Sequence, residues 1–156
     1  MTESLANLAK RTDATVAAAR AELVRGIRDA ARAGMTQTQI ANEVGRSQPE
    51  VNRLLRFHGT SPLSLRLRER AGDVRRELGR SGGGNVRVFG SVARGEDDAD
   101  SDIDLLVDLE TPMSLMQISA LENRLADILG ARVDLVRAAS LRPDIKDEIL
   151  STAVPL

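Results

Sequence analysis

The sequence predicts two modules. Residues 1–60 form an all-α module, and residues 61–156 form an α/β (α+β) module around a small mixed sheet. Apolar residues recur at helical spacing through the first 80 residues, whereas short alternating runs typical of strands appear after residue 84. Charge divides at the same place: residues 1–80 carry 15 Lys and Arg against 9 Asp and Glu, and residues 81–156 carry 7 against 14. A part with net charge +6 beside one with −7 indicates one module that meets nucleic acid and one that holds cations.

Composition predicts a cytoplasmic protein. The 156 residues include no cysteine, which excludes disulfides and thiolate metal sites and favours a reducing compartment. The first ten residues contain Glu3 and no apolar signal segment, and no later stretch is apolar for long enough to cross a bilayer. We therefore expect no membrane association.

The first module is predicted to be helical throughout. Residues 3–33 predict one long helix, or two that break near Thr12 and Asp13, and Gly34 ends the run. A pair of short helices is predicted next, joined by Gly45, which permits a left-handed turn. Their apolar faces consist of Ile40, Ala41 and Val44 on the first helix and Val51 and Leu54 on the second.

The second short helix has the features of a DNA-reading element. Ser47 and Glu50 match the S-x-x-E capping box, and Pro49 lies in the first turn, where its missing N–H costs nothing. The stretch resembles the helix-turn-helix of bacterial transcription regulators. The candidate DNA-binding residues are Arg46, Ser47, Gln48, Asn52, Arg53 and Arg56. Because one module offers few contacts, operator binding would call for a homodimer that reads two half-sites. A protein interface is the alternative. His58, the single histidine, follows the helix end and is given no catalytic role.

Two amphipathic helices are expected in the second module. Residues 61–80 predict one charged helix with Ser61 as its cap and Leu65, Val74 and Leu78 turned inward. Residues 114–130 predict another. Its inward positions are Leu115, Ile118, Leu121, Leu125 and Ile128.

Three strands are expected to carry polar groups at the same place. The strand NVRVFG ends at Gly90 and Ser91, a pair suited to the backbone approach of a phosphate. In SDIDLLVDLE, Asp102 and Asp104 are two residues apart and so point to the same side of the sheet. A third strand, ARVDLV, presents Asp134 beside them. Clustered carboxylates need a cation, and three oxygen donors of this kind predict a two-metal Mg²⁺ site.

A calcium loop is the alternative for the acidic segment, and it fails. Asp98, Asp100 and Asp102 match the first three ligand positions of an EF-hand. Ile103 then stands where the loop needs glycine, and Leu109 where it needs glutamate. The loop aspartates Asp97, Asp98 and Asp100 are therefore predicted to be solvated.

The motif as a whole resembles a known superfamily. Gly90-Ser91, ten intervening residues, Asp102-x-Asp104 and a later Asp134 on a strand are similar to the DNA polymerase beta-type nucleotidyltransferases. The stretch GSVARGEDDADSDIDLLVD resembles the minimal nucleotidyltransferases that act as antitoxin partners of HEPN-domain toxins. The resemblance covers residues 82–156.

This resemblance implies a set of roles. Gly90 and Ser91 would cradle the triphosphate of ATP, and Asp102 and Asp104 would bind both Mg²⁺ ions. Asp134 would hold the ion that activates the attacking hydroxyl. The reaction implied is transfer of AMP to a hydroxyl, a tyrosine of the HEPN toxin. Arg94 meets a phosphate, or forms a structural ion pair with Glu96 or an aspartate. The alternative is a non-catalytic transcription regulator that binds operator DNA and neutralises its partner by binding alone.

Overall fold

The computed structural model describes residues 3–156 and divides into two compact units, residues 1–55 and 56–156. Each unit is described by itself. The functional modules 1–60 and 61–156 stay a prediction, since a compact unit and a functional module need not share a boundary. Within the described residues, no helix combines the length and apolar character needed to span a bilayer.

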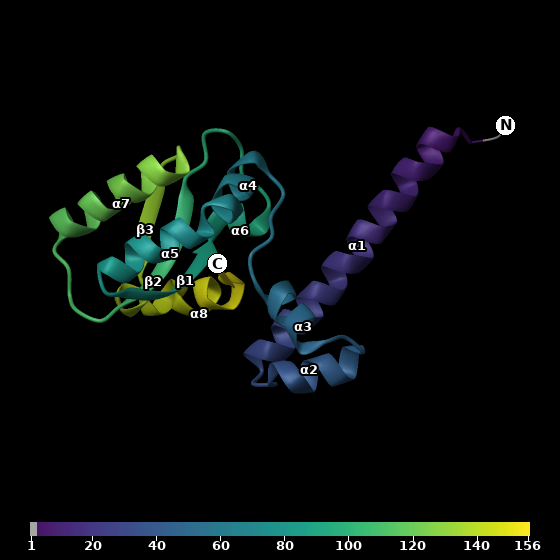
Figure 1. Ribbon diagram of the computed structural model, residues 1–156, viewed down its shortest axis with the longest axis horizontal. Helices are drawn as coiled ribbons and strands as arrows, with labels where there is room; N and C mark the ends of the chain where they lie inside the picture. Colours follow the sequence, from purple (N-terminus) through teal and green to yellow (C-terminus); the bar gives the residue numbers. More distant parts are fainter. Residues whose placement is uncertain (1–2) are drawn as a thin grey trace. The chain divides into compact units, whose positions relative to one another are not determined.

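The first unit is all-α, as expected. It contains α1 (Leu5–Arg32), α2 (Gln37–Val44) and α3 (Gln48–Leu55), visible at the purple to blue end of Figure 1. Of the two alternatives for the first segment, the structure has the single long helix, which runs unbroken through Thr12 and Asp13. Thr36 and Gln39 form a full capping box at the start of α2, and Gly45 ends it in the left-handed conformation with φ 65°. The core comprises Val24, Ile27, Ile40, Ala41, Val51 and Leu54.

The second unit is α+β. Its elements are α4 (Pro62–Glu69), α5 (Ala71–Arg80), β1 (Gly83–Phe89), α6 (Gly90–Arg94), β2 (Ile103–Leu109), α7 (Leu115–Leu129), β3 (Val133–Arg137), a 3₁₀ turn (Ala138–Ser140), α8 (Pro143–Thr152) and β4 (Val154–Pro155).

The strands form one mixed four-stranded sheet in the order β3-β2-β1-β4. β1 is antiparallel to both β2 and β4, whereas β2 and β3 are parallel. The small mixed sheet expected from the sequence is therefore present, with β4 as an additional edge strand.

The charged segment 61–80 differs from the prediction, because it is two helices that meet at Arg70. The break rotates α4, so Leu63 and Leu67 are buried while Leu65 is 45 % exposed. The predicted inward position of Leu65 is thus wrong. Val74 and Leu78 on α5 are buried as expected.

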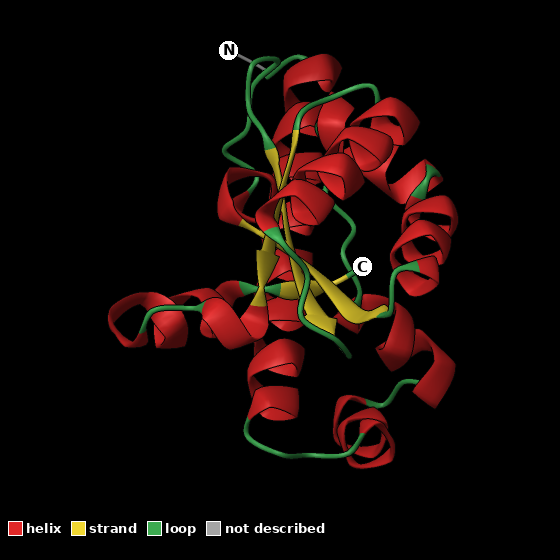
Figure 2. Cartoon of the chain, turned by 90° about the vertical axis from the view of Figure 1, so that its left-hand side faces the viewer, coloured by secondary structure: helices red, strands yellow, loops and turns green. Residues whose placement is uncertain are grey.

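Helices α5 and α7 cover one face of the sheet, with α5 packed on β1 and α7 on β3; both are labelled in Figure 1, and Figure 2 shows helices packed beside the strands. Leu121, Leu125 and Leu129 are the buried residues of α7. The prediction for Leu115 is wrong, because this first helical residue is 83 % exposed at the end of the helix, beyond the sheet's cover.

Candidate active site

The strand pairing brings the acidic residues together on one face. Asp104 lies opposite Phe89 of β1 on one side and opposite Asp134 of β3 on the other. Side chains directly opposite each other in a sheet share a face, so Asp104 and Asp134 stand side by side. Asp102 is two residues before Asp104 and lies immediately before β2, on the same face. The buried residues Ile103, Leu105 and Val107 occupy the other face.

Gly90 lies directly under the carboxylate of Asp104. The residue has φ 70°, and a Cβ atom placed there would collide with Oδ2 of Asp104. The missing side chain therefore makes room for an acidic group of the protein itself. From the sequence we expected the glycine to make room for a ligand only; the structure gives it a positioning task that no local pattern reveals.

Asp104 is the electrostatic centre of the site. Its pKa is raised to about 6, first because the group is partly buried, and then because the charges of Asp134 and Asp102 oppose its ionisation. The positive charge of Arg94 acts in the opposite direction, but more weakly. Burial and the two neighbouring carboxylates thus both disfavour the ionised form of Asp104.

Asp102 has a cation of its own. The Nε of Arg132 lies 2.9 Å from Oδ1 of Asp102 as an ion pair. That oxygen is shielded from solvent, yet within the described residues no donor meets hydrogen-bond geometry toward it. The backbone fixes the pairing, since the amide of Ile103 donates to the carbonyl of Arg132 at 2.9 Å. Arg132 also donates to the carbonyl of Asp100.

The donor set fits a divalent cation by its chemistry. No three carboxylate or imidazole groups among residues 3–156 are already gathered closely enough to hold a metal ion. However, Asp104 is flanked by two further carboxylates that raise its pKa, and one oxygen of Asp102 lacks a hydrogen bond. Clustered carboxylate oxygens whose negative charge is not fully neutralised are suitable ligands for Mg²⁺. Asp102 and Asp104 would hold one ion once Arg132 is displaced, and Asp134 would supply a further ligand.

The two remaining predicted nucleotide-binding residues belong to α6. Ser91 is half-buried near the start of the helix, and Arg94 is exposed at its end. Arg94 pairs with Glu96 at 2.9 Å, which is one of the two roles expected for it. Its effect on the Asp104 pKa also brings its charge to the site.

The candidate DNA-binding residues occupy α3 and its approach. The Ser47 hydroxyl accepts the amide of Glu50 at 3.3 Å and so acts as a helix cap. The Glu50 carboxylate instead pairs with Arg46 at 2.8 Å, so it does not complete the predicted capping box. Arg53 is exposed on α3. Arg56 is the first residue of the second unit.

Gln37 of α2 organises two of these side chains. Its Oε1 accepts from Nε2 of Gln48 at 3.0 Å and from Nδ2 of Asn52 at 3.3 Å. Sequence reasoning missed Gln37, because the link runs across the turn between two helices rather than along one.

Comparison with known proteins identifies the second unit. Residues 68–155, more than half of the chain, match the nucleotidyltransferase domain family. The chain belongs to this family. A protein adenylyltransferase MntA from Thermococcus cleftensis is 46% identical over 88 residues, which are 56% of this chain and 79% of that protein. A Methanocaldococcus jannaschii protein assigned the same activity is 44% identical over 66 residues, 42% of this chain and 67% of that protein.

Solved structures agree with the nucleotidyltransferase fold. A chain assigned as a minimal nucleotidyltransferase has 41% identity and a TM-score of 0.54, covering 64% of this chain and all of that one. A toxin-antitoxin structure with AMP-PNP has 22% identity and a TM-score of 0.50, covering 54% and 69%. At that identity the likeness concerns the fold alone.

One residue that contacts the site, Arg132, escaped the sequence analysis, and one expectation for the neighbouring loop, that for Asp97, differs from the structure. Arg132 comes directly before β3, just as Asp102 comes directly before β2, and the two are 30 residues apart in the sequence. Asp134 and Asp104, which face each other in the sheet, are separated by the same 30 residues. That equal offset was an available signal for Arg132. Asp97 is half-buried rather than solvated, and its Oδ1 has no hydrogen-bond partner within the described residues. Nothing in its loop composition indicates this.

Proposed function

We propose that this nucleotidyltransferase is an antitoxin-type protein adenylyltransferase, which transfers AMP from ATP to a tyrosine hydroxyl of a partner HEPN-family toxin. The observation that carries the proposal is the position of Asp104, over Gly90 and beside Asp134, with its pKa raised to about 6. Burial beside two other carboxylates does not stabilise the fold, whereas carboxylates with perturbed pKa values are common at catalytic sites. The 46% identity to a protein adenylyltransferase supports the same activity.

The proposed division of labour follows from exposure and charge. The backbone at Gly90 and the Ser91 hydroxyl bind the triphosphate, and Arg94 exchanges Glu96 for a phosphate. Asp102 and Asp104 would hold the first of two Mg²⁺ ions once Arg132 is displaced, and Asp134 would join them as a ligand of the second. The ions, when bound, lower the pKa of the acceptor hydroxyl and neutralise the leaving pyrophosphate.

The exposed Asp134 faces the acceptor in this scheme. It receives the hydroxyl proton while the acceptor oxygen forms a bond to the α-phosphorus of ATP. The bond from that phosphorus to the β-phosphate oxygen breaks, and pyrophosphate leaves. Because the raised pKa of about 6 still lies below neutral pH, Asp104 is ionised under these conditions and available to a cation.

The test is intact-mass spectrometry of the products of the neighbouring genes, after incubation with the full chain, ATP and Mg²⁺. We expect a gain of one or more AMP units that is lost in Asp102→Asn and Asp104→Asn. Asp108→Asn is the matched control, since Asp108 lies on the same strand but is exposed and pairs with Arg87. A gain that survives both site substitutions would overturn the proposed site.

The non-catalytic alternative makes a different prediction in the same experiment. If the protein neutralises its partner by binding alone, the complex forms and the toxin mass stays unchanged. Neutralisation would then survive the Asp104→Asn substitution.

We further propose that α2 and α3 bind operator DNA. The support is the left-handed turn at Gly45 between two packed helices, together with the amides of Gln48 and Asn52 held by Gln37. The test is titration of the duplex upstream of the reading frame at several salt concentrations. Arg53→Ala should weaken binding and reduce the salt slope by about one unit. Arg11→Ala, at the far end of α1, is the control. A DNA affinity that does not change with salt concentration would refute this role.

A further inference from the structure

Most of α1 packs against nothing in the first unit. Every residue from 5 to 22 is exposed, including the apolar Leu5 at 83 % and Val16 at 61 %. This free part is about 27 Å long. A helix of this length in water ordinarily owes its stability to an apolar face packed on a partner. The exposure of Leu5 and Val16 therefore raises the question of what covers them.

Mostly apolar positions follow a heptad along α1; Thr12 is polar, and Leu23 and Ala30 at the C-terminal end are half-buried. Spacings of four and three residues alternate without interruption from Leu5 to Ala30, so these positions form one stripe along the helix. Several members are small, which lets a second helix approach closely. The stripe consists of Leu5, Ala9, Thr12, Val16, Ala19, Leu23, Gly26 and Ala30.

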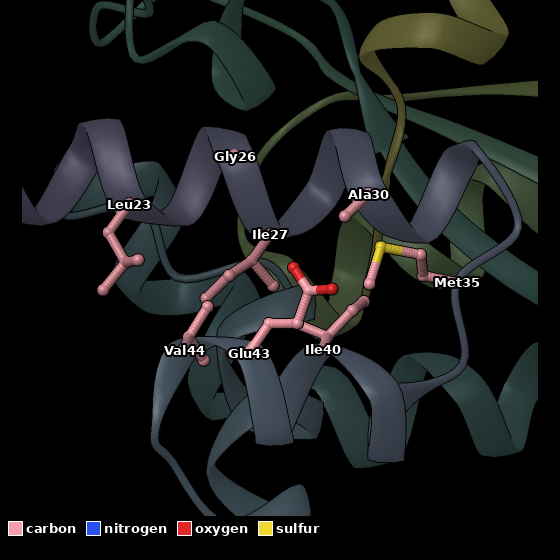
Figure 3. Close-up of a pocket in the computed structure, with 8 residues that line it drawn as sticks. All are labelled: Leu23, Gly26, Ile27, Ala30, Met35, Ile40, Glu43 and Val44. Atoms are coloured by element: carbon pink, nitrogen blue, oxygen red, sulfur yellow. The ribbon is translucent and has the colours of Figure 1, made fainter.

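The stripe ends in an open pocket between α1 and α2. Figure 3 shows the side chains of Leu23, Ile27 and Ala30 of α1 directed toward α2, which contributes Ile40 and Val44 to the lining. The pocket has a volume of about 200 Å³ and a mainly apolar lining. The volume and the apolar lining suit a leucine side chain, and the pocket lies at the C-terminal end of the stripe.

Charge distinguishes the possible occupants. Asp13 and Arg20 are both exposed, flank the stripe on the same side, and form no ion pair within residues 3–156. In an antiparallel pair of identical helices, residues on the same side of the two stripes face each other, so Asp13 of each copy meets Arg20 of the other. A parallel pair in register sets Asp13 against Leu8 and Arg20 against Thr15. The helix is therefore complementary to itself in the antiparallel arrangement only.

We propose that α1 is the dimer interface of this protein, formed with a second copy in antiparallel orientation. Val16 then faces Ala19 of the other copy, and Leu5 faces Ala30 at the mouth of the pocket. The dimer rests on α1 and α2 alone and does not depend on the transferase activity. It would supply the two-fold symmetry that two operator half-sites require.

The oligomeric state of the full chain tests the proposal. Light scattering across a dilution series should give a dimer, and Val16→Asp should give a monomer with unchanged helical circular dichroism, because Val16 already lies exposed in the single chain. Ala21→Asp is the control, since it places the same group on the opposite side of α1 and should leave the dimer intact. A wild-type monomer at every concentration, or a dimer indifferent to Val16→Asp, would overturn the proposal.

Two further experiments test the orientation. Asp13→Arg or Arg20→Asp alone should raise the dimer Kd about ten-fold, since each creates two like-charged contacts, and the double swap should restore it. Because the chain contains no cysteine, any disulfide must form between cysteines that are introduced by substitution. Leu5→Cys with Ala30→Cys should cross-link two copies, whereas Leu5→Cys alone should not. Cross-linking through Cys at position 5 alone would show a parallel pair and refute the antiparallel one.

Discussion

Replacing Gly90 by alanine should disable the site by moving one carboxylate. The new Cβ would occupy the space of Oδ2 of Asp104, so the Asp104 side chain must rotate away or β2 must shift. Gly90 also has φ 70°, a conformation that costs an alanine about 1–2 kcal/mol. The substitution thus combines a backbone cost with a steric displacement inside the site.

Gly95 separates the two effects. It has φ 73°, nearly the same backbone conformation, and an added Cβ there meets no atom within 4 Å. Gly95→Ala should therefore cost only the backbone part, about 1–2 kcal/mol. Gly90→Ala should cost about 1–3 kcal/mol more, because an overpacked site must rearrange.

Activity should separate the two variants further. A displacement of about 1 Å in a catalytic group can lower the rate about 100-fold, so we expect a loss of that order for Gly90→Ala and little change for Gly95→Ala. The assays are urea unfolding and the initial rate of AMP transfer, measured on both variants. Equal losses of stability and of rate in the two variants would refute the role given to Gly90.

Three other outcomes are expected. The pKa of Asp104 is about 6 in the folded protein and 3.8 in the unfolded chain, so ionisation of this group lowers the stability of the fold as the pH rises through this range. Because the carboxyl is half exposed, we expect the loss of stability above pH 6 to be about 1 kcal/mol. Asp104→Asn should therefore be more stable than wild type at pH 7.5 without metal in thermal unfolding, and the gap should close toward pH 4; a gap independent of pH would contradict the pKa. Arg132→Gln should tighten Mg²⁺ binding up to about five-fold by calorimetry, because Asp102 loses its competing ion pair, and weaker binding would mean that Arg132 instead supports the site. Leu125→Ala should lower the free energy of unfolding by about 3 kcal/mol and the exposed Leu115→Ala by less than about 0.5, and equal losses would contradict the packing of α7.

The agreement between sequence and structure is best where a pattern is local. Alternating apolar residues identified β1, β2 and β3, and the small mixed sheet was expected from the resemblance to the nucleotidyltransferases. The end of α2 was equally readable, because few residues other than glycine adopt the left-handed turn at Gly45. Errors arose at helix ends. Leu115 keeps the helical spacing of its neighbours but lies beyond the part of α7 that meets the sheet.

The sequence by itself determined which chemical groups are present and on which strands. The two-residue spacing fixed Asp102 and Asp104 on a common face, and the apolar flanks of Asp134 fixed it on a strand. Only the tertiary structure decided how these groups meet. Strand register set Asp104 opposite Asp134, the contact with Gly90 fixed its carboxylate, and the parallel pairing of β2 with β3 brought Arg132 to Asp102. Spacing along a chain is local, whereas register and electrostatic fields depend on segments 30 residues apart that meet only when the sheet is complete.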